Sequence, residues 1–222
     1  RIRIVIRGGI SSVKTAKSRI ISPRDQSANL RCSPCPDHRM SAPNVALNDL
    51  AERMMRTMAF EPTAGQRKAI SAMERLLGSR TNAATLVLRG YAGTGKTTLV
   101  GALVKSLMDV KWPVVLLAPT GRAAKVLAAH AQLGASTIHR RIYRMAGDDG
   151  EGWGMMVAPN RDRGALFIVD EASMIGAGNS SFGERDLLSD LLEHVFSVQG
   201  CKLLLIGDPA HAYHDVWVPT SS

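Results

Sequence analysis

Residues 85–97 join a short apolar strand to a glycine-rich turn. They read Thr85-Leu86-Val87-Leu88-Arg89-Gly90-Tyr91-Ala92-Gly93-Thr94-Gly95-Lys96-Thr97, and apolar residues then recur at helical spacing from Thr98 to Met108. Glycines let a backbone curl so that its N–H groups point inward, and the start of a helix adds partial positive charge. This order of strand, turn and helix predicts a phosphate-binding loop formed by Gly90, Tyr91, Ala92, Gly93, Thr94, Gly95, Lys96, Thr97 and Thr98.

Two side chains of this loop have chemistry suited to a nucleotide. Lys96 can place a mobile positive charge at the β- and γ-phosphates, and the Thr97 hydroxyl can ligate a bridging Mg²⁺. A plain glycine-rich turn with an exposed lysine is the alternative, but the flanking strand and helix disfavour it. We therefore expect ATP and Mg²⁺ as cofactors, with Lys96 as a catalytic residue.

A second apolar strand ends in two carboxylates. Residues 166–171 read Leu-Phe-Ile-Val-Asp-Glu, and ligands of open parallel sheets bind at the carboxyl ends of the strands. Asp170 is expected to hold the metal through its water shell, and Glu171 to orient and polarise the attacking water. A solvated acidic pair at a helix start is the alternative, but the preceding phosphate-binding loop favours a Walker B site.

The remaining apolar runs predict the architecture. Further strands are expected at Val114–Ala118 and Leu203–Ile206, and helices at residues 122–132 and 187–196. Such unbroken apolar strands suit a parallel sheet covered by helices on both faces. The sequence therefore predicts an α/β fold, a three-layer P-loop NTPase domain with a mainly parallel sheet.

The segments before the first predicted strand, and the segment between residues 146 and 164, have shorter periodic patterns. A helix is expected around Val45–Met58, and Pro62-Thr63-Ala64 is expected to start another that runs through Leu77. Residues 146–164 are rich in glycine and charged residues, which is typical of a surface loop, with a small hairpin around Trp153–Val157.

Four more segments follow the phosphate-binding loop in a characteristic order. They are Ala118-Pro119-Thr120-Gly121-Arg122-Ala123-Ala124, Ser136-Thr137-Ile138-His139-Arg140, Asp170-Glu171-Ala172-Ser173-Met174 and Gly207-Asp208-Pro209-Ala210. Together these segments resemble the first RecA-like domain of RecD/Dda-type superfamily 1B DNA helicases, which include the exodeoxyribonuclease V alpha subunit. The resemblance covers roughly Phe60 to Ala210 and implies a RecA-like fold.

The resemblance also implies residue roles and partners. Gln66 would contact adenine, and Asp208 would help to sense the γ-phosphate. Single-stranded DNA would meet Thr120, Arg122, Thr137 and His139. A second helicase domain or subunit would complete the motor, which would move 5′ to 3′ in recombination or repair. From the residues alone, Arg122 can equally be a solvated helix residue, and His139 a hydrogen-bonded, partly buried histidine.

Charge is concentrated at the start of the chain. The net charge is +9, but residues 1–40 carry nine Lys/Arg and two Asp. Apart from Arg1–Ile6, residues 1–39 lack periodicity, so we expect a disordered or mis-assigned upstream segment. Met40-Ser-Ala-Pro-Asn resembles a translation start, which we prefer to a basic tail that binds nucleic acid. The expected division is residues 1–39, a helical segment at 40–59, the ATPase domain at 60–210 and a divergent tail at 211–222.

The family pattern changes after Ala210. His211 stands where the resemblance implies a glutamine, and a frameshift or truncated reading frame would explain this. The resemblance also implies a second RecA-like domain that supplies arginines to the nucleotide, and no apolar strand after Asp208 is available to build it. We therefore expect slow ATP hydrolysis and no unwinding by these residues alone. A nucleotide-binding module without turnover and a non-motor P-loop enzyme such as a kinase remain alternatives.

The sequence has only weak signals for a Cys/His metal site or a membrane span. Cys32, Cys35 and His38 have half of a zinc pattern, and His211 and His214 lack a third ligand, so neither predicts a metal site. No run approaches the roughly 18 apolar residues that span a bilayer. We therefore expect no membrane partner and a cytoplasmic location.

Overall fold

The computed structural model describes residues 3–7, 49–81, 83–145, 155–175 and 186–208. Six strands form one sheet in the order β1-β2-β8-β7-β3-β4. Five of them are mutually parallel, whereas β1 pairs antiparallel with β2. The strands of this sheet are β1 (Arg3–Arg7), β2 (Ala84–Arg89), β3 (Val114–Ala118), β4 (Ala135–Thr137), β7 (Leu166–Val169) and β8 (Lys202–Gly207). The predicted mainly parallel sheet is confirmed.

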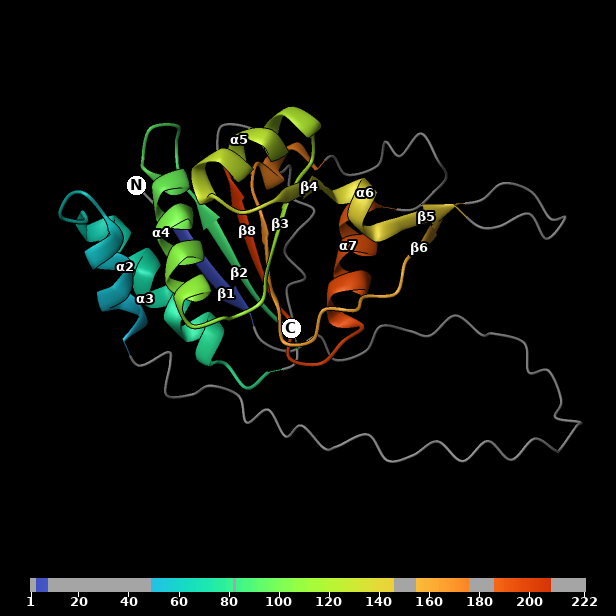
Figure 1. Ribbon diagram of the computed structural model, residues 1–222, viewed down its shortest axis with the longest axis horizontal. Coiled ribbons are helices and arrows are strands. Elements are labelled where there is room, and N and C mark those ends of the chain that lie inside the picture. The colour runs from blue at the N-terminus through green and yellow to red at the C-terminus, as the bar shows by residue number, and fades with distance from the viewer. Residues whose placement is uncertain (1–2, 8–48, 82, 146–154, 176–185, 209–222) are drawn as a thin grey trace, which may run out of the picture.

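Helices cover both faces of the sheet (Figure 1). One face is covered by α2 (Leu50–Thr57), α3 (Ala64–Gly78), α4 (Lys96–Asp109) and α5 (Gly121–Ala131), and the other by α6 (Ile138–Ile142) and α7 (Leu187–Phe196). A short 3₁₀ helix, η1 (Ala172–Met174), follows β7. The predicted three-layer α/β architecture is confirmed.

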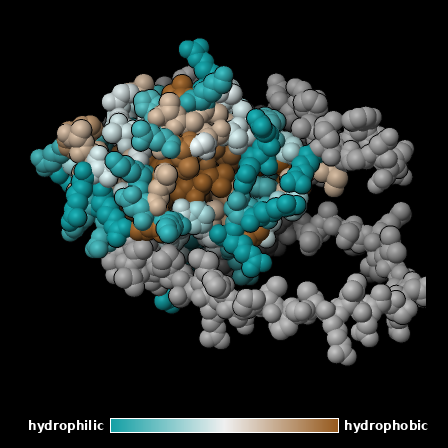
Figure 2. Space-filling model, in the orientation of Figure 1, coloured by the Kyte–Doolittle hydropathy of each residue, from teal (hydrophilic) through white to brown (hydrophobic). Residues whose placement is uncertain are grey.

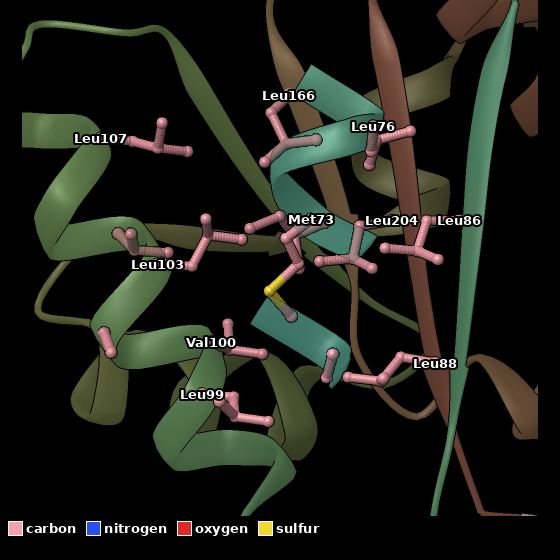
Figure 3. Packing of buried hydrophobic residues seen from close by; sticks show 14 of the residues in the cluster. Met73, Leu76, Leu86, Leu88, Leu99, Val100, Leu103, Leu107, Leu166 and Leu204 are labelled. Atoms are coloured by element: carbon pink, nitrogen blue, oxygen red, sulfur yellow. The ribbon is translucent and has the colours of Figure 1, made fainter. Parts of the chain in front are cut away.

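The apolar core lies in two clusters, one on each side of the sheet. Side chains alternate along a strand, so Leu166 and Ile168 of β7 face one cluster, while Phe167 and Val169 face the other. All four are fully buried. Figure 3 shows the cluster between α3, α4 and the sheet, where Met73 lies among leucines of β2 and α4. The strand sequences are unbroken apolar runs because both faces need apolar side chains.

Helix starts follow capping chemistry in the sequence. The Thr63 side chain accepts the N–H of Gln66, and the Gln66 side chain accepts the N–H of Thr63, which completes a capping box at α3. The predicted start of this helix at Pro62-Thr63-Ala64 agrees with the structure. The preceding helix, expected around Val45–Met58, is described as α2 from Leu50.

Two regions differ from or refine the expectations. Residues 3–7, within the segment not expected to fold, form β1 against β2, although Arg1–Ile6 had been set apart as the only periodic part. The expected hairpin consists of β5 (Tyr143–Met145) and β6 (Met155–Val157), so one of its strands precedes the glycine-rich loop.

Several predictions concern residues outside the described part. They involve Cys32, Cys35, His38, Met40, His211 and His214, and the tail at 211–222. Within the described part, no group of three His, Cys, Asp or Glu side chains is arranged to hold a metal ion. No helix described there is both long and apolar enough to cross a membrane.

Candidate nucleotide-binding site

The strand order brings three sequence motifs to one edge of the sheet. Strand β8 lies between β2 and β7, with Arg89 beside Gly207 and Val169 beside Leu205. Because these strands are parallel, the residues that follow them meet at their carboxyl ends. Gly90, Asp170 and Asp208 therefore emerge from three adjacent strands.

The phosphate-binding loop takes the conformation that its glycines permit. Gly93 and Gly95 have positive φ angles of 75° and 80°, which favour glycine. A β-carbon on Gly95 would lie 2.5 Å from Nε2 of Gln66, so space as well as backbone angle selects glycine there. At the start of the loop, the Gly90 N–H donates to the carbonyl of Gly207 at 3.2 Å. The loop is thus attached to the end of β8.

The Lys96 ammonium lies against its own loop. Nζ donates to the carbonyl oxygen of Tyr91 at 2.8 Å and also to that of Gly90. Lys96 is the first residue of α4, and its charge acts on Asp170. The lysine is therefore at the predicted place, with main-chain acceptors as its present partners.

Asp170 is a partly buried carboxyl group at the end of β7. Burial raises its pKa above the ordinary value of 3.8, while the Glu171 N–H at 2.9 Å and the charge of Lys96 act in the opposite direction. The Asp170 N–H donates to the Leu117 carbonyl at 3.0 Å, which continues the pairing between β7 and β3. This backbone hydrogen bond fixes the position of Asp170 at the end of β7.

Glu171 lies directly beyond Asp170 in an unusual backbone conformation. Its φ and ψ are 51° and 34°, the left-handed region, and its side chain is exposed. A residue other than glycine is uncommon in this region and costs free energy. The turn separates the two carboxylates, so Asp170 is partly buried while Glu171 faces solvent.

Asp208 contacts the phosphate-binding loop directly. Its Oδ2 accepts the N–H of Ala92 at 3.1 Å, and its own N–H donates to Oγ of Ser173 at 3.4 Å. Gly207 lies so close to Ser173 that an added β-carbon would be 3.3 Å from the Ser173 nitrogen. Asp208 therefore links the loop to the turn after β7. Ser173 had no predicted role, since nothing in its sequence position shows this long-range contact.

Gln66 is buried against the loop. It is 4% exposed, its Oε1 accepts the N–H of Thr63, and its Nε2 donates to the Thr94 carbonyl at 3.3 Å. The side chain thus lies against the predicted phosphate-binding loop. Its amide atoms nevertheless bind the protein itself, and adenine contact stays a prediction.

The four residues predicted to face DNA occupy two neighbouring strand ends. Strands β3 and β4 pair in parallel, with Ala118 beside Thr137, so the segments that follow both strands lie side by side. Thr120 and Thr137 cap α5 and α6 through their hydroxyl oxygens, which leaves each hydroxyl proton free to donate. Arg122 and His139 are exposed. Their DNA contacts stay predictions.

The residues present fit Mg-ATP. Backbone N–H groups of a left-handed glycine turn, an ammonium, a hydroxyl and a carboxylate are the donors and ligands that phosphate and Mg²⁺ require. They come from a single edge of the sheet. Lys96 and the loop amides would hold phosphates, and Thr97 and Asp170 would hold the ion.

Comparison with known proteins places the chain in a family. A family model described as an AAA domain matches residues 62–212, and the chain belongs to that family. It is 34% identical over 138 residues to the ATP-dependent RecD2 DNA helicase of Deinococcus radiodurans, a match that covers 62% of this chain and 17% of that protein. It is 28% identical over 155 residues to the ATP-dependent DNA helicase dda of Enterobacteria phage T4, covering 68% of this chain and 33% of the helicase. These findings confirm a RecD/Dda-like superfamily 1 helicase domain. The chain spans no more than about a third of the length of either relative.

Proposed function

We propose that this chain binds Mg-ATP, hydrolyses it slowly, and is the first motor domain of a RecD/Dda-like 5′-to-3′ DNA helicase used in recombination or repair. The observation that carries the proposal is that the loop from Gly90 to Lys96 meets Asp170 and Asp208 at the ends of three adjacent strands. The two similar helicases are named as ATP-dependent and as acting on DNA, which supports the choice of nucleotide and partner.

Each residue has a separate task in this proposal. Lys96 neutralises the β- and γ-phosphates, and Thr97 and Asp170 hold Mg²⁺, which spreads the charge of the phosphates when bound. Glu171 is exposed, so it can orient a water molecule and accept its proton. Asp208 contacts Ala92 of the loop and can therefore respond to a change at the γ-phosphate.

Thermal unfolding with nucleotide tests the phosphate site. Mg-ADP at about a hundred times its dissociation constant should stabilise the folded chain by about 2.7 kcal/mol. Lys96→Ala should lose most of this shift at the same nucleotide concentration, because the phosphates lose their cation. Lys68→Ala, which removes an exposed lysine on α3, is the matched control. Equal shifts in wild type and Lys96→Ala would refute the assignment.

Turnover distinguishes the proposal from its alternatives. Glu171→Gln should bind nucleotide but lose residual hydrolysis, since an amide is a poor proton acceptor. Binding by the wild type with no hydrolysis would favour a nucleotide-binding module. Phosphate transferred to an acceptor other than water would favour a kinase-like enzyme.

A further inference from the structure

A basic pocket lies apart from the phosphate-binding loop. It has a volume of about 220 Å³, several times the share of one water molecule in the liquid. Its walls come from α6 and β5, from residues 158–162 and from α7. No residue of the loop or of the Asp170-Glu171 pair lines it. Hydrophilic residues gather over α6 and α7 in Figure 2.

Four arginines line this basic pocket, namely Arg140, Arg141, Arg144 and Arg161. All four are exposed. The lining contains one carboxylate, Asp162, which pairs with Arg141. Among the described residues, no ion pair involves the other three arginines. The pocket therefore has a local charge of about +3, whereas residues 41–222 have a net charge of only +2. Like charges at this density repel one another, so an anion bound among them would be stabilised.

Asp162 is the one acidic residue of the lining, and the buried carboxylate of Asp190 accepts a hydrogen bond from the hydroxyl of Tyr143, which also lines the pocket. His194 also lines the pocket, with Nδ1 2.7 Å from the Ala158 carbonyl, so Nδ1 carries the hydrogen and donates. Its other nitrogen, Nε2, is buried and has no partner in the described part of the chain. The guanidinium groups are thus the groups that would hold an anion. Their planar N–H forks match phosphate oxygens.

The pocket continues the surface predicted to meet DNA. Thr137 caps α6 by accepting the N–H of Arg140, so both belong to one short helix. The ring of Tyr143, which lines the pocket, lies 5.8 Å from the ring of His139. Tyr143 is held by a 2.7 Å hydrogen bond from its hydroxyl to the buried carboxylate of Asp190 on α7. Aromatic rings beside a positive groove are typical of surfaces that bind single-stranded nucleic acid.

We propose that the basic pocket binds backbone phosphates of a nucleic-acid strand, extending the contact surface beyond Thr137 and His139. The inference rests on the proposed function only in taking nucleic acid as the substrate. An acidic segment of a protein offers carboxylates instead of phosphates. The aromatic pair at the edge of the pocket favours a strand with bases that can stack.

Anisotropy of a fluorescein-labelled oligothymidylate tests the pocket in the full 222-residue chain. Arg144→Gln/Arg161→Gln removes two pocket arginines but leaves the pair of Arg141 with Asp162 intact. We expect at least a tenfold loss of affinity at low salt. The dependence of log K on log salt should become shallower by about 1.4, because each lost contact with single-stranded phosphate contributes about 0.7.

Arg75→Gln/Arg80→Gln is the matched control, since it removes the same charge from exposed arginines elsewhere. It should lose less than threefold and keep the salt slope. Equal losses in the two double variants would overturn the proposal, as would wild-type affinity in the pocket variant. Weakened binding of polyglutamate by the pocket variant, with DNA affinity unchanged, would overturn it in favour of an acidic protein partner. Mg-ADP stabilisation is measured alongside. If it persists in the pocket variant, a loss of DNA binding concerns the pocket and not the nucleotide site.

Discussion

Gln66 joins the start of α3 to the phosphate-binding loop through the two ends of one amide group. Oε1 accepts from the start of α3, and Nε2 donates to Thr94 of the phosphate-binding loop. A glutamate at this position would keep the first contact, since glutamate also completes a capping box. It would place a carboxylate oxygen against the Thr94 carbonyl. The Gln66→Glu substitution therefore keeps the contact with Thr63 and removes the hydrogen bond to Thr94.

We expect Gln66→Glu to weaken Mg-ADP and Mg-GDP binding by a similar factor, because the loop that holds phosphates is displaced. Gln66→Ala should do the same and also lower thermal stability by about 1 kcal/mol, because the Thr63 N–H loses its hydrogen bond to the Gln66 side chain. Isothermal titration with both nucleotides measures the effect. A loss confined to the adenine nucleotide would instead assign Gln66 to base recognition, as the resemblance implies.

His194 predicts a pH dependence of stability. Burial lowers its pKa below the ordinary value of 6.5, while the hydrogen bond to Ala158 acts in the opposite direction. The unfolded chain therefore takes up the proton first as the pH falls. The stabilising contribution of neutral His194 is complete above pH 6.5 and is lost as the pH falls below 6.5 toward the lowered pKa of the folded state.

Thermal unfolding between pH 7.5 and 5.5 should show this loss, with the midpoint falling as the pH is lowered. His194→Asn, which keeps a donor for Ala158, should have a flatter pH profile. His139→Asn replaces an exposed histidine and should keep the wild-type profile. Identical profiles for wild type and His194→Asn would rule out His194 as the titrating group.

At the scale of elements, β1 covers the edge of β2 through five paired positions. Deletion of residues 1–39 should therefore lower the melting temperature. Cooperative unfolding should survive, because residues 50–206 alone supply two extensive apolar clusters, one on each side of the sheet. Nonspecific DNA affinity should also fall, with a weaker salt dependence, since residues 1–39 carry most of the net charge.

A proline variant separates the loss of stability from the loss of DNA affinity that we expect on deletion of residues 1–39. Val5→Pro/Ile6→Pro removes backbone donors from β1 without changing charge, so it should lower stability but keep DNA affinity. Differential scanning calorimetry and anisotropy on the same samples measure both. Loss of the cooperative transition on deletion would show that the first 39 residues contribute to the core.

The elements differ in how far the sequence predicts them. Strands β2, β3, β7 and β8 are unbroken apolar runs with buried faces, and their positions were predicted to within two residues. Strand β4 and α6 have three and five residues, too few for a period to be recognised. The pairing of β1 depends on a partner some eighty residues away, which no local pattern encodes.

The sequence predicts the phosphate-binding loop at the candidate nucleotide site, but it does not predict the basic pocket. Gly90–Thr97 is one continuous segment whose neighbours in sequence are also its neighbours in space. The pocket is assembled from α6 and β5, from residues 158–162, and from α7, so its charge is dispersed along the chain. The left-handed backbone of Glu171 was likewise hidden, because glutamate gives no signal for that conformation.

For the whole molecule, the structure describes one α/β lobe whose candidate nucleotide site lies at the carboxyl ends of its parallel strands. In P-loop enzymes that use an arginine from a partner, this residue contributes about 10³ to 10⁵ in rate. We therefore expect the isolated 222-residue chain to hydrolyse ATP slowly and not to separate a DNA duplex. A strand-displacement assay measures this, with Lys96→Ala to exclude contaminating helicase. ATP-dependent unwinding that disappears in that variant would mean that copies of the chain assemble a working motor.

The contact between Asp208 and Ala92 has a kinetic consequence. In the structure, the Asp208 carboxylate accepts the N–H of Ala92, and carbonyls of the loop accept hydrogen bonds from the ammonium of Lys96. A phosphate that binds the Ala92 N–H must displace the Asp208 carboxylate, which is part of the chain and therefore stays close to the loop. Nucleotide entry is then a ligand exchange in two steps, and its observed rate should level off at high nucleotide concentration. The plateau is the rate at which Asp208 releases the loop.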